Sequence, residues 1–195
     1  MNKESSAKII LIILALLPGT SLCAEIKSIE VRKENNHYYL HMNATLSADV
    51  DNIIRIITDY DNLTLINPYL KESKVLNKTE NERTTVSMLT KACVLFLCYN
   101  IRHLQTFYFI ENNILFSRVI PEGSDFKAGW SRWEIKAMDS NKIYPVTQII
   151  LDIEVVPKFF VLPVIGSHQI KRKMLKMAKI TIDKLEEKAK LTFPD

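Results

Sequence analysis

Cys93, Cys98 and His103 carry side chains that can bind zinc or attack a substrate, and they lie close together in this 195-residue sequence. Structural zinc sites usually combine a closely spaced cysteine pair with a second cluster of ligands, and the sequence contains neither. A catalytic thiol needs a base beside it, and no neighbouring residue marks one. The sequence therefore predicts no metal site and no catalytic cysteine.

The spacing of the two cysteines leaves two structural alternatives. On one continuous strand they would lie about 16 Å apart, whereas a disulfide requires Cα atoms within about 7 Å of each other. Either both thiols are unpaired, or the chain reverses direction between them. The intervening residues are Val94, Leu95, Phe96 and Leu97. Four exposed apolar residues in a row are unfavourable unless function requires them, so they either contact a membrane or a cavity mouth or pack against the fold.

Paired carboxylates are a second candidate for chemistry. Asp152 and Glu154 share one face of a strand-like segment, where they could act as acid and base. The alternate positions are apolar, which indicates that the carboxylates face water instead. Further polar candidates for the rim of a binding site are Arg102, His103, Arg118, Glu122 and Asp125. Beyond residue 24 glycines are too sparse for a phosphate-binding loop, and we expect no catalytic residues and no cofactor.

Residues 1–24 have the layout of a secretory signal peptide. Lys3 and Lys8 precede an apolar run from Ile9 to Leu17, which is too short to span a membrane. Its removal takes away two lysines and one glutamate and lowers the formal net charge from +4 to +3. We therefore expect an exported, periplasmic domain over residues 25–195. The alternative is a protein anchored to the membrane by an uncleaved N-terminal segment.

Periodicity predicts the elements that position these residues. Residues 26–33 and 37–46 are expected to form strands, and Tyr38, Leu40, Met42, Ala44 and Leu46 fall on one strand face. Ser47 can cap a short helix with a buried stripe at Val50, Ile53, Ile54 and Ile57, and a second short helix is expected to end before Pro68.

The rest of the chain predicts strands followed by one helix. Five short β-rich segments lie at 83–89, 101–110, 114–120, 130–136 and 146–156. Because the connections are too short for parallel crossovers, these strands must pair antiparallel. A helix from Val164 to Leu191 carries an apolar stripe, and it is the obvious element to cover one face of the sheet. The stripe comprises Ile170, Met174, Met177, Ala178, Ile182, Leu185 and Ala189.

Three parts of the chain together resemble the START-like, helix-grip superfamily, in the branch of polyketide cyclases and coenzyme Q-binding proteins. They are "ATLSADVDNIIRIITDYDNLTLINPYLKESKVL", "IPEGSDFKAGWSRWEI" and the terminal amphipathic helix. The resemblance covers about residues 40–189. It implies an α+β fold in which a curved antiparallel sheet grips the long helix, with two short helices after the first strands and a hydrophobic cavity inside.

The resemblance also implies a hairpin at the cysteines, which would place Cys93 opposite Cys98. In an oxidising compartment such a pair closes into a disulfide. The cavity would be lined by aromatic residues and methionines, which adapt well to irregular ligands. The candidates for ligand contact are Phe107, Phe109, Phe116, Trp130, Trp133, Met174 and Met177.

These features lead to one expected function and two alternatives. We expect an exported protein that binds a hydrophobic small molecule, a lipid or an isoprenoid, for transport or sensing. The alternatives are an enzyme of the polyketide-cyclase type acting on an apolar substrate and an interaction module whose core is filled by its own side chains. Cations of the C-terminal helix could attract anionic lipid, or simply form a solvated outer face. No nucleic-acid-binding motif is present.

Overall fold

The structure is a computed structural model that describes residues 24–79, 82–94, 97–138, 145–161 and 165–191. Residues 1–23 of the predicted signal peptide lie outside this range. The elements in chain order are β1 Glu25–Glu34, β2 His37–Leu46, α1 Val50–Ile57, η1 Tyr60–Leu65, β3 Leu70–Lys78, β4 Thr84–Val94, β5 Leu97–Glu111, β6 Ile114–Val119, β7 Phe126–Met138, β8 Val146–Pro157 and α2 Ile165–Lys190.

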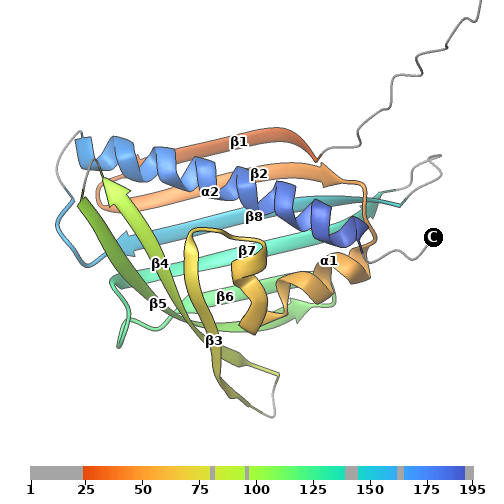
Figure 1. Ribbon diagram of the computed structural model, residues 1–195, viewed down its shortest axis with the longest axis horizontal. Coiled ribbons are helices and arrows are strands. Elements are labelled where there is room, and N and C mark those ends of the chain that lie inside the picture. Colours follow the sequence, from red (N-terminus) through yellow and green to blue (C-terminus); the bar gives the residue numbers. More distant parts are fainter. Residues whose placement is uncertain (1–23, 80–81, 95–96, 139–144, 162–164, 192–195) are drawn as a thin grey trace, which may run out of the picture.

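The strands form one eight-stranded antiparallel sheet in the order β1-β2-β8-β7-β6-β5-β4-β3. Every sheet neighbour is also a sequence neighbour except the pair of β2 and β8. After β2 the chain passes through α1 and the 3-10 helix η1, and it re-enters the sheet at the opposite edge as β3 (Figure 1). The α+β class, the curved sheet and the two short helices predicted from the sequence are confirmed.

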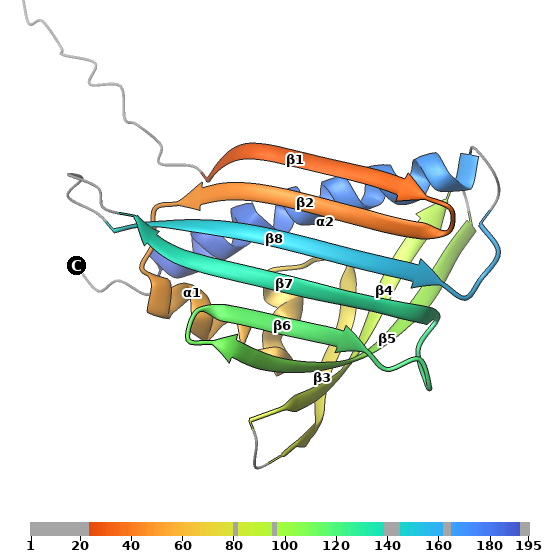
Figure 2. The same cartoon turned by 180° about the vertical axis from the view of Figure 1, so that it is seen from behind.

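Helix α2 lies across one face of the sheet, which we call the inner face; the opposite face is the outer face (Figures 1 and 2). The inner face carries the predicted row of β2, whose members are nearly or fully buried: Tyr38, Leu40, Met42, Ala44 and Leu46. From α2 the residues Ala178, Ile182, Leu185 and Ala189 are buried against the sheet. The second half of α2 is therefore packed into the core, as its apolar stripe predicts.

The N-cap of α1 differs from the prediction. Asp49, not Ser47, caps the helix, and its carboxylate accepts from the backbone N–H groups of Asp51 and Asn52. The backbone N–H of Ser47 instead donates to Glu186 of α2, so Ser47 lies outside the cap. The buried residues of α1 are Ile53 and Ile57, while Val50 and Ile54 pack at the margin of the core.

Strand β3 was not singled out by the sequence pattern. Most of its residues are exposed, so the strand lacks a clear apolar row. It is the last strand of the sheet and has a neighbouring strand on one side only. Strand β4 also runs further than the predicted segment 83–89, as far as Val94. Within the described residues, no helix combines the length and apolar composition needed to cross a bilayer.

Candidate functional site

The strand register sorts the predicted ligand-contact residues onto two faces. Phe107 pairs with the buried Ser117, and Trp133 pairs with Leu115 and Leu151 of the core, so both lie on the inner face. Phe109 shares the parity of Phe107 but lies near the end of β5, where its side chain is 38% exposed. On α2, Met174 packs against the core and Met177 is half-buried.

The prediction that Phe116 and Trp130 contact the ligand needs correction. They lie on the outer face, because Phe116 directly follows the inward-facing Leu115 and Trp130 directly precedes Ser131, which hydrogen-bonds to the inward-facing Ser117. Their rings stack in parallel, with centroids 6.0 Å apart. Since the outer face is opposite α2, these two aromatic residues do not line the space between sheet and helix.

Within the part of the chain that the structure describes, three buried side-chain polar atoms of the inner face have no hydrogen-bond partner: Tyr38 Oη, Thr90 Oγ1 and His103 Nε2. Thr90 of β4 pairs with Ile101 and His103 of β5 pairs with Met88, so Thr90 and His103 are diagonal neighbours across two strands. Tyr38 is the second residue of β2. The three residues belong to different strands, and β8, β7 and β6 separate β2 from β5 in the sheet order.

Aromatic rings lie beside His103, and a lysine lies beside Tyr38. The His103 ring lies 4.7 Å from the ring of Phe126, centroid to centroid, and Phe126 lies 6.5 Å from Phe159. The Tyr38 ring is completely buried, and Lys33 Nζ lies 5.7 Å from its centroid. Because all three are buried polar residues of the inner face, we call Tyr38, Thr90 and His103 the inner polar cluster; the name refers to the face that they share and not to a contact of Tyr38 with the other two.

Burial lowers the pKa of His103 to about 4, although the nearby Asp125 carboxylate acts in the opposite direction. The imidazole is therefore neutral at pH 7, and Nε2 either donates or accepts depending on its tautomer. The hydroxyl groups of Thr90 and Tyr38 can do both. Leaving a buried polar atom without a partner costs roughly 1–3 kcal/mol. A hydroxyl or carbonyl group of a bound apolar molecule would be a suitable hydrogen-bond partner for Thr90 or His103.

The other proposed rim residues are not buried members of this cluster. Arg102, Arg118 and Glu122 are exposed, and Arg118 shares the outer face with Phe116. Asp125 fastens the connection between β6 and β7 to β5, because its Oδ2 accepts from the backbone N–H of Arg102 at 2.6 Å. Of the predicted polar candidates, His103 alone joins the inner polar cluster.

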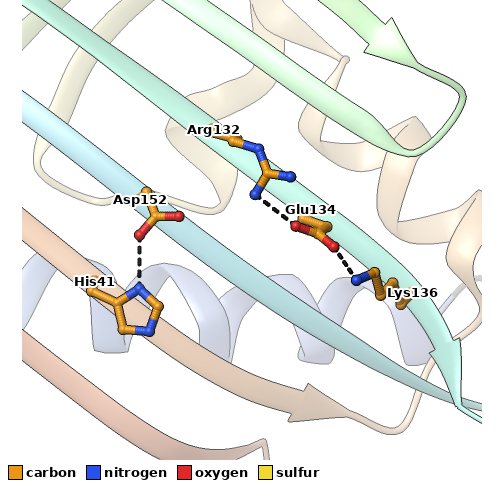
Figure 3. A network of polar contacts seen from close by, with 5 residues as sticks. All are labelled: His41, Arg132, Glu134, Lys136 and Asp152. Atoms are coloured by element: carbon orange, nitrogen blue, oxygen red, sulfur yellow. Dashed lines mark hydrogen bonds and ion pairs between the residues drawn. The ribbon is translucent and has the colours of Figure 1, made fainter.

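The predicted carboxylate pair is engaged on the outer face. Asp152 Oδ1 lies 2.7 Å from His41 Nδ1, and Glu134 is held by Arg132 and Lys136 on the neighbouring strand (Figure 3). Glu154 accepts from Trp130 Nε1 at 2.6 Å and contacts His37 Nδ1 at 2.5 Å.

The charge state of the outer-face carboxylates follows from these contacts. Partial burial raises the pKa of Glu154, but the hydrogen bonds from His37 and Trp130 outweigh burial and hold it below its usual value. Hydrogen bonds from Lys136 and Arg132 lower the pKa of Glu134. A general acid needs a raised pKa, so both groups have the charge state of ion-pair partners rather than of proton donors.

Cys93 and Cys98 form a disulfide across the hairpin of β4 and β5, where they are directly paired. Their sulfur atoms are thus bonded to each other, and among the described residues no group of three metal-ligating side chains is found. The side chains of Val94, Leu95, Phe96 and Leu97 lie outside the described residues, so their predicted membrane contact stays a prediction.

Two surface hollows lie away from the inner polar cluster. One, of about 150 Å³, lies among α1, η1 and the end of α2, and Arg55, Asp59 and Lys188 contribute charged groups to it. The other adjoins the turn between β5 and β6. Neither is lined by Tyr38, Thr90 or His103.

Comparison with known proteins supports the fold. No protein-family model matches the chain, and no curated protein sequence matches it. Solved structures do resemble it, and among them is a START superfamily protein from Mycobacterium smegmatis. That protein is 17% identical, with a TM-score of 0.63, over 80% of this chain and 99% of its own.

Two further structures have the same arrangement. The Zhui aromatase/cyclase from Streptomyces sp. R1128 is 11% identical with a TM-score of 0.65, over 79% of this chain and 94% of its own. A protein from Thermus thermophilus is 14% identical with a TM-score of 0.63, over 80% of this chain and 99% of its own. The chain therefore has the START-like helix-grip fold, as the sequence resemblance implied.

Sequence reasoning found part of the inner polar cluster. His103 was named as a polar candidate, and Tyr38 was placed on the buried face of its strand. Thr90 was not named as a site candidate, although it lies in the outgoing strand of the expected hairpin. Its signal is the continued alternation through β4, which places Val86, Met88 and Thr90 on one buried face.

Proposed function

We propose that this protein is an exported carrier or sensor of a hydrophobic small molecule, bound between the inner face of the sheet and α2. The observation that supports it best is the inner polar cluster, three buried polar atoms for which the described residues supply no hydrogen-bond partner, on a face whose buried residues are mainly apolar. A ligand that is apolar over most of its length, with one neutral hydrogen-bonding group, fits such a region. His103 is neutral at pH 7 and suits a neutral hydrogen-bonding group, while Lys33 Nζ, 5.7 Å from the Tyr38 ring, places a cation beside Tyr38.

The arrangement of the elements favours ligand entry near that cluster. Helix α2 contacts β1 and β2 and packs on α1, while η1 covers β3 at the far side of the sheet. The Tyr60 ring lies 4.8 Å from Phe107, so η1 closes the inner face there. In the sheet order β8, β7, β6, β5 and β4 lie between β2 and β3, and the last two carry His103 and Thr90.

Export is supported by the predicted signal peptide and by the disulfide. Disulfides persist mainly in oxidising compartments such as the bacterial periplasm. The prediction of a periplasmic location is tested by fractionating cells that express the full chain. Recovery of the shortened, disulfide-bonded protein in the periplasmic fraction is expected, whereas full-length protein in the membrane fraction would favour the uncleaved anchor.

Mass spectrometry of the protein purified from that fraction tests the ligand. The expected result is a co-purifying lipid or isoprenoid that carries a hydroxyl or carbonyl group and is released only by denaturation. The proposal fails if the protein carries no apolar molecule and also binds no fluorescent apolar probe. Conversion of an added apolar substrate would instead favour the cyclase-type enzyme.

A further inference from the structure

Several turns and ends of strands and helices lie together at one end of the molecule. Figures 1 and 2 both place the β1–β2 turn, the β4–β5 hairpin, the β6–β7 connection, the end of β8 and the start of α2 at this end. The two termini of the described chain and α1 lie toward the opposite end. The end that holds the β4–β5 hairpin and the start of α2 is therefore the surface that we consider for contact with a membrane.

Three aromatic side chains are exposed at this end. Phe160, just after β8, is 81% exposed, and its neighbour Phe159 is 40% exposed. Tyr99 follows Cys98 in the hairpin and is 55% exposed. Large aromatic side chains in water are unfavourable, and aromatic rings are enriched at the boundary between lipid and water. We call these three residues the aromatic end.

The charge beside the aromatic end is positive. The first acidic residue of α2 is Asp183, and the residues before it include Lys171, Arg172, Lys173, Lys176 and Lys179. Arg172, Lys176 and Lys179 are exposed and follow the i, i+4, i+7 spacing of one helical face. Lys91 and Lys158 add cations from β4 and from the segment after β8.

The acidic residues near this end do not cancel that charge. Asp125 is the last residue of the β6–β7 connection, and its carboxylate accepts a hydrogen bond from the backbone N–H of Arg102. Glu122 is exposed in the same connection, and Glu34 ends β1 with Arg32 as its ion-pair partner at 3.4 Å. Neither Glu34 nor Glu122 belongs to α2 or to the segment that holds Phe159 and Phe160.

We propose that the aromatic end docks onto a bilayer that contains anionic phospholipids. Phe159 and Phe160 enter the interface, and the cations of α2 contact the lipid head groups. Exposed aromatic rings beside a stretch of α2 that holds no acidic residue before Asp183 complement such a surface in both polarity and charge. Phe159 also contacts Phe126, which contacts His103, so one row of rings joins the docking surface to the inner polar cluster.

Vesicle co-sedimentation of the exported chain tests the proposal. Binding is expected to vesicles of phosphatidylcholine with one third phosphatidylglycerol, weak binding to pure phosphatidylcholine, and loss of binding as salt rises. The double variant Phe159→Ser/Phe160→Ser should bind at least tenfold more weakly. Arg172→Gln, Lys176→Gln and Lys179→Gln should each weaken binding by about fivefold.

A matched control removes an equally exposed apolar side chain elsewhere. Leu76 of β3 is 55% exposed, and Leu76→Ser should leave vesicle binding unchanged. The proposal is overturned if the Phe159/Phe160 variant binds like the unmodified protein, if Leu76→Ser loses as much, or if neutral vesicles bind equally well. It is also overturned if the phenylalanine pair only changes the oligomeric state in analytical ultracentrifugation, because the aromatic end would then contact a second copy.

Membrane docking and ligand binding can be measured separately. Binding of a fluorescent apolar probe in solution, without vesicles, should be the same for Phe160→Ser, which changes a residue outside the row of rings, and for the unmodified protein. If the unmodified protein binds vesicles but no apolar probe, the proposed function fails and the docking proposal stands.

Discussion

The backbone N–H of Ser47 donates to Glu186 Oε1 at 2.8 Å, and this bond joins the end of β2 to the second half of α2. Glu186 is only 3% exposed, and its other carboxylate oxygen lies 3.3 Å from Lys190 Nζ. A buried carboxylate is stable only when it is paired. Glu186 is therefore a fastening point between the sheet and the helix that it grips.

Replacement of Glu186 by alanine should destabilise the fold by about 1–3 kcal/mol, because it leaves the Ser47 N–H without its acceptor. Glu186→Gln keeps an acceptor oxygen and should cost less. Glu187→Ala, on the exposed side of the same turn, serves as the control and should change the free energy of unfolding by less than about 0.5 kcal/mol. Urea unfolding at pH 7 measures all three. Equal losses for Glu186→Ala and Glu187→Ala would contradict the fastening role.

The Ser47 contact also shows what sequence pattern leaves open. The apolar stripe of α1 was predictable because burial follows periodicity, but Ser47 and Asp49 both have side chains that cap helices. The choice depends on Glu186, which lies 139 residues further along the chain. Phe116 and Trp130 illustrate the same limit, since strand parity groups residues by face but does not say which face α2 covers. That assignment requires the tertiary fold.

Stability should fall in acid because of His103. Its pKa is about 4 in the folded protein and about 6.5 when unfolded, so the unfolded chain binds more protons between these values. The contribution is fully present above about pH 6.5 and is lost as the pH falls toward 4, by up to about 3 kcal/mol.

The urea midpoint measured between pH 7 and pH 4.5 checks this prediction. His103→Phe should flatten the pH dependence in this window. Thr90→Val, which removes the neighbouring buried hydroxyl but keeps the imidazole, should retain it. An unchanged slope in His103→Phe would show that other groups cause the acid sensitivity.

The disulfide should contribute modestly to stability. Because it closes a short loop, the chain-entropy estimate is roughly 2 kcal/mol. The double variant Cys93→Ser/Cys98→Ser should lose about this amount in denaturant unfolding, and a reductant should have the same effect on the unmodified protein but none on the variant. Binding of an apolar probe should persist in both. Loss of probe binding on reduction would instead assign the cysteines a direct part in ligand contact.

Gly129 is required where β7 passes β8 and β6. A Cβ atom there would lie 2.8 Å from the Glu154 carbonyl oxygen and 2.9 Å from Val119 Cγ2. Because the first neighbour is backbone, Gly129→Ala should destabilise the protein by about 1–3 kcal/mol. Gly123 is a useful contrast, since its added Cβ meets only Leu104 Cδ2 at 3.6 Å and its cost arises from φ of +85°. Thermal unfolding of both alanine variants, with Ala128→Ser as an exposed control on β7, measures the difference.

The inner polar cluster should select ligands by one hydrogen-bonding group. We expect a fluorophore-labelled long-chain alcohol to bind more tightly than the same labelled chain without its hydroxyl, by about three- to tenfold for one buried hydrogen bond. His103→Phe keeps an aromatic ring against Phe126 but removes Nε2, so it should abolish the preference while leaving affinity for the hydroxyl-free chain intact. His41→Phe changes an outer-face histidine and should leave the preference unchanged. If His103→Phe weakens both probes equally, His103 shapes the interior without recognising a polar group. If neither probe binds the unmodified protein, the core is filled by its own side chains.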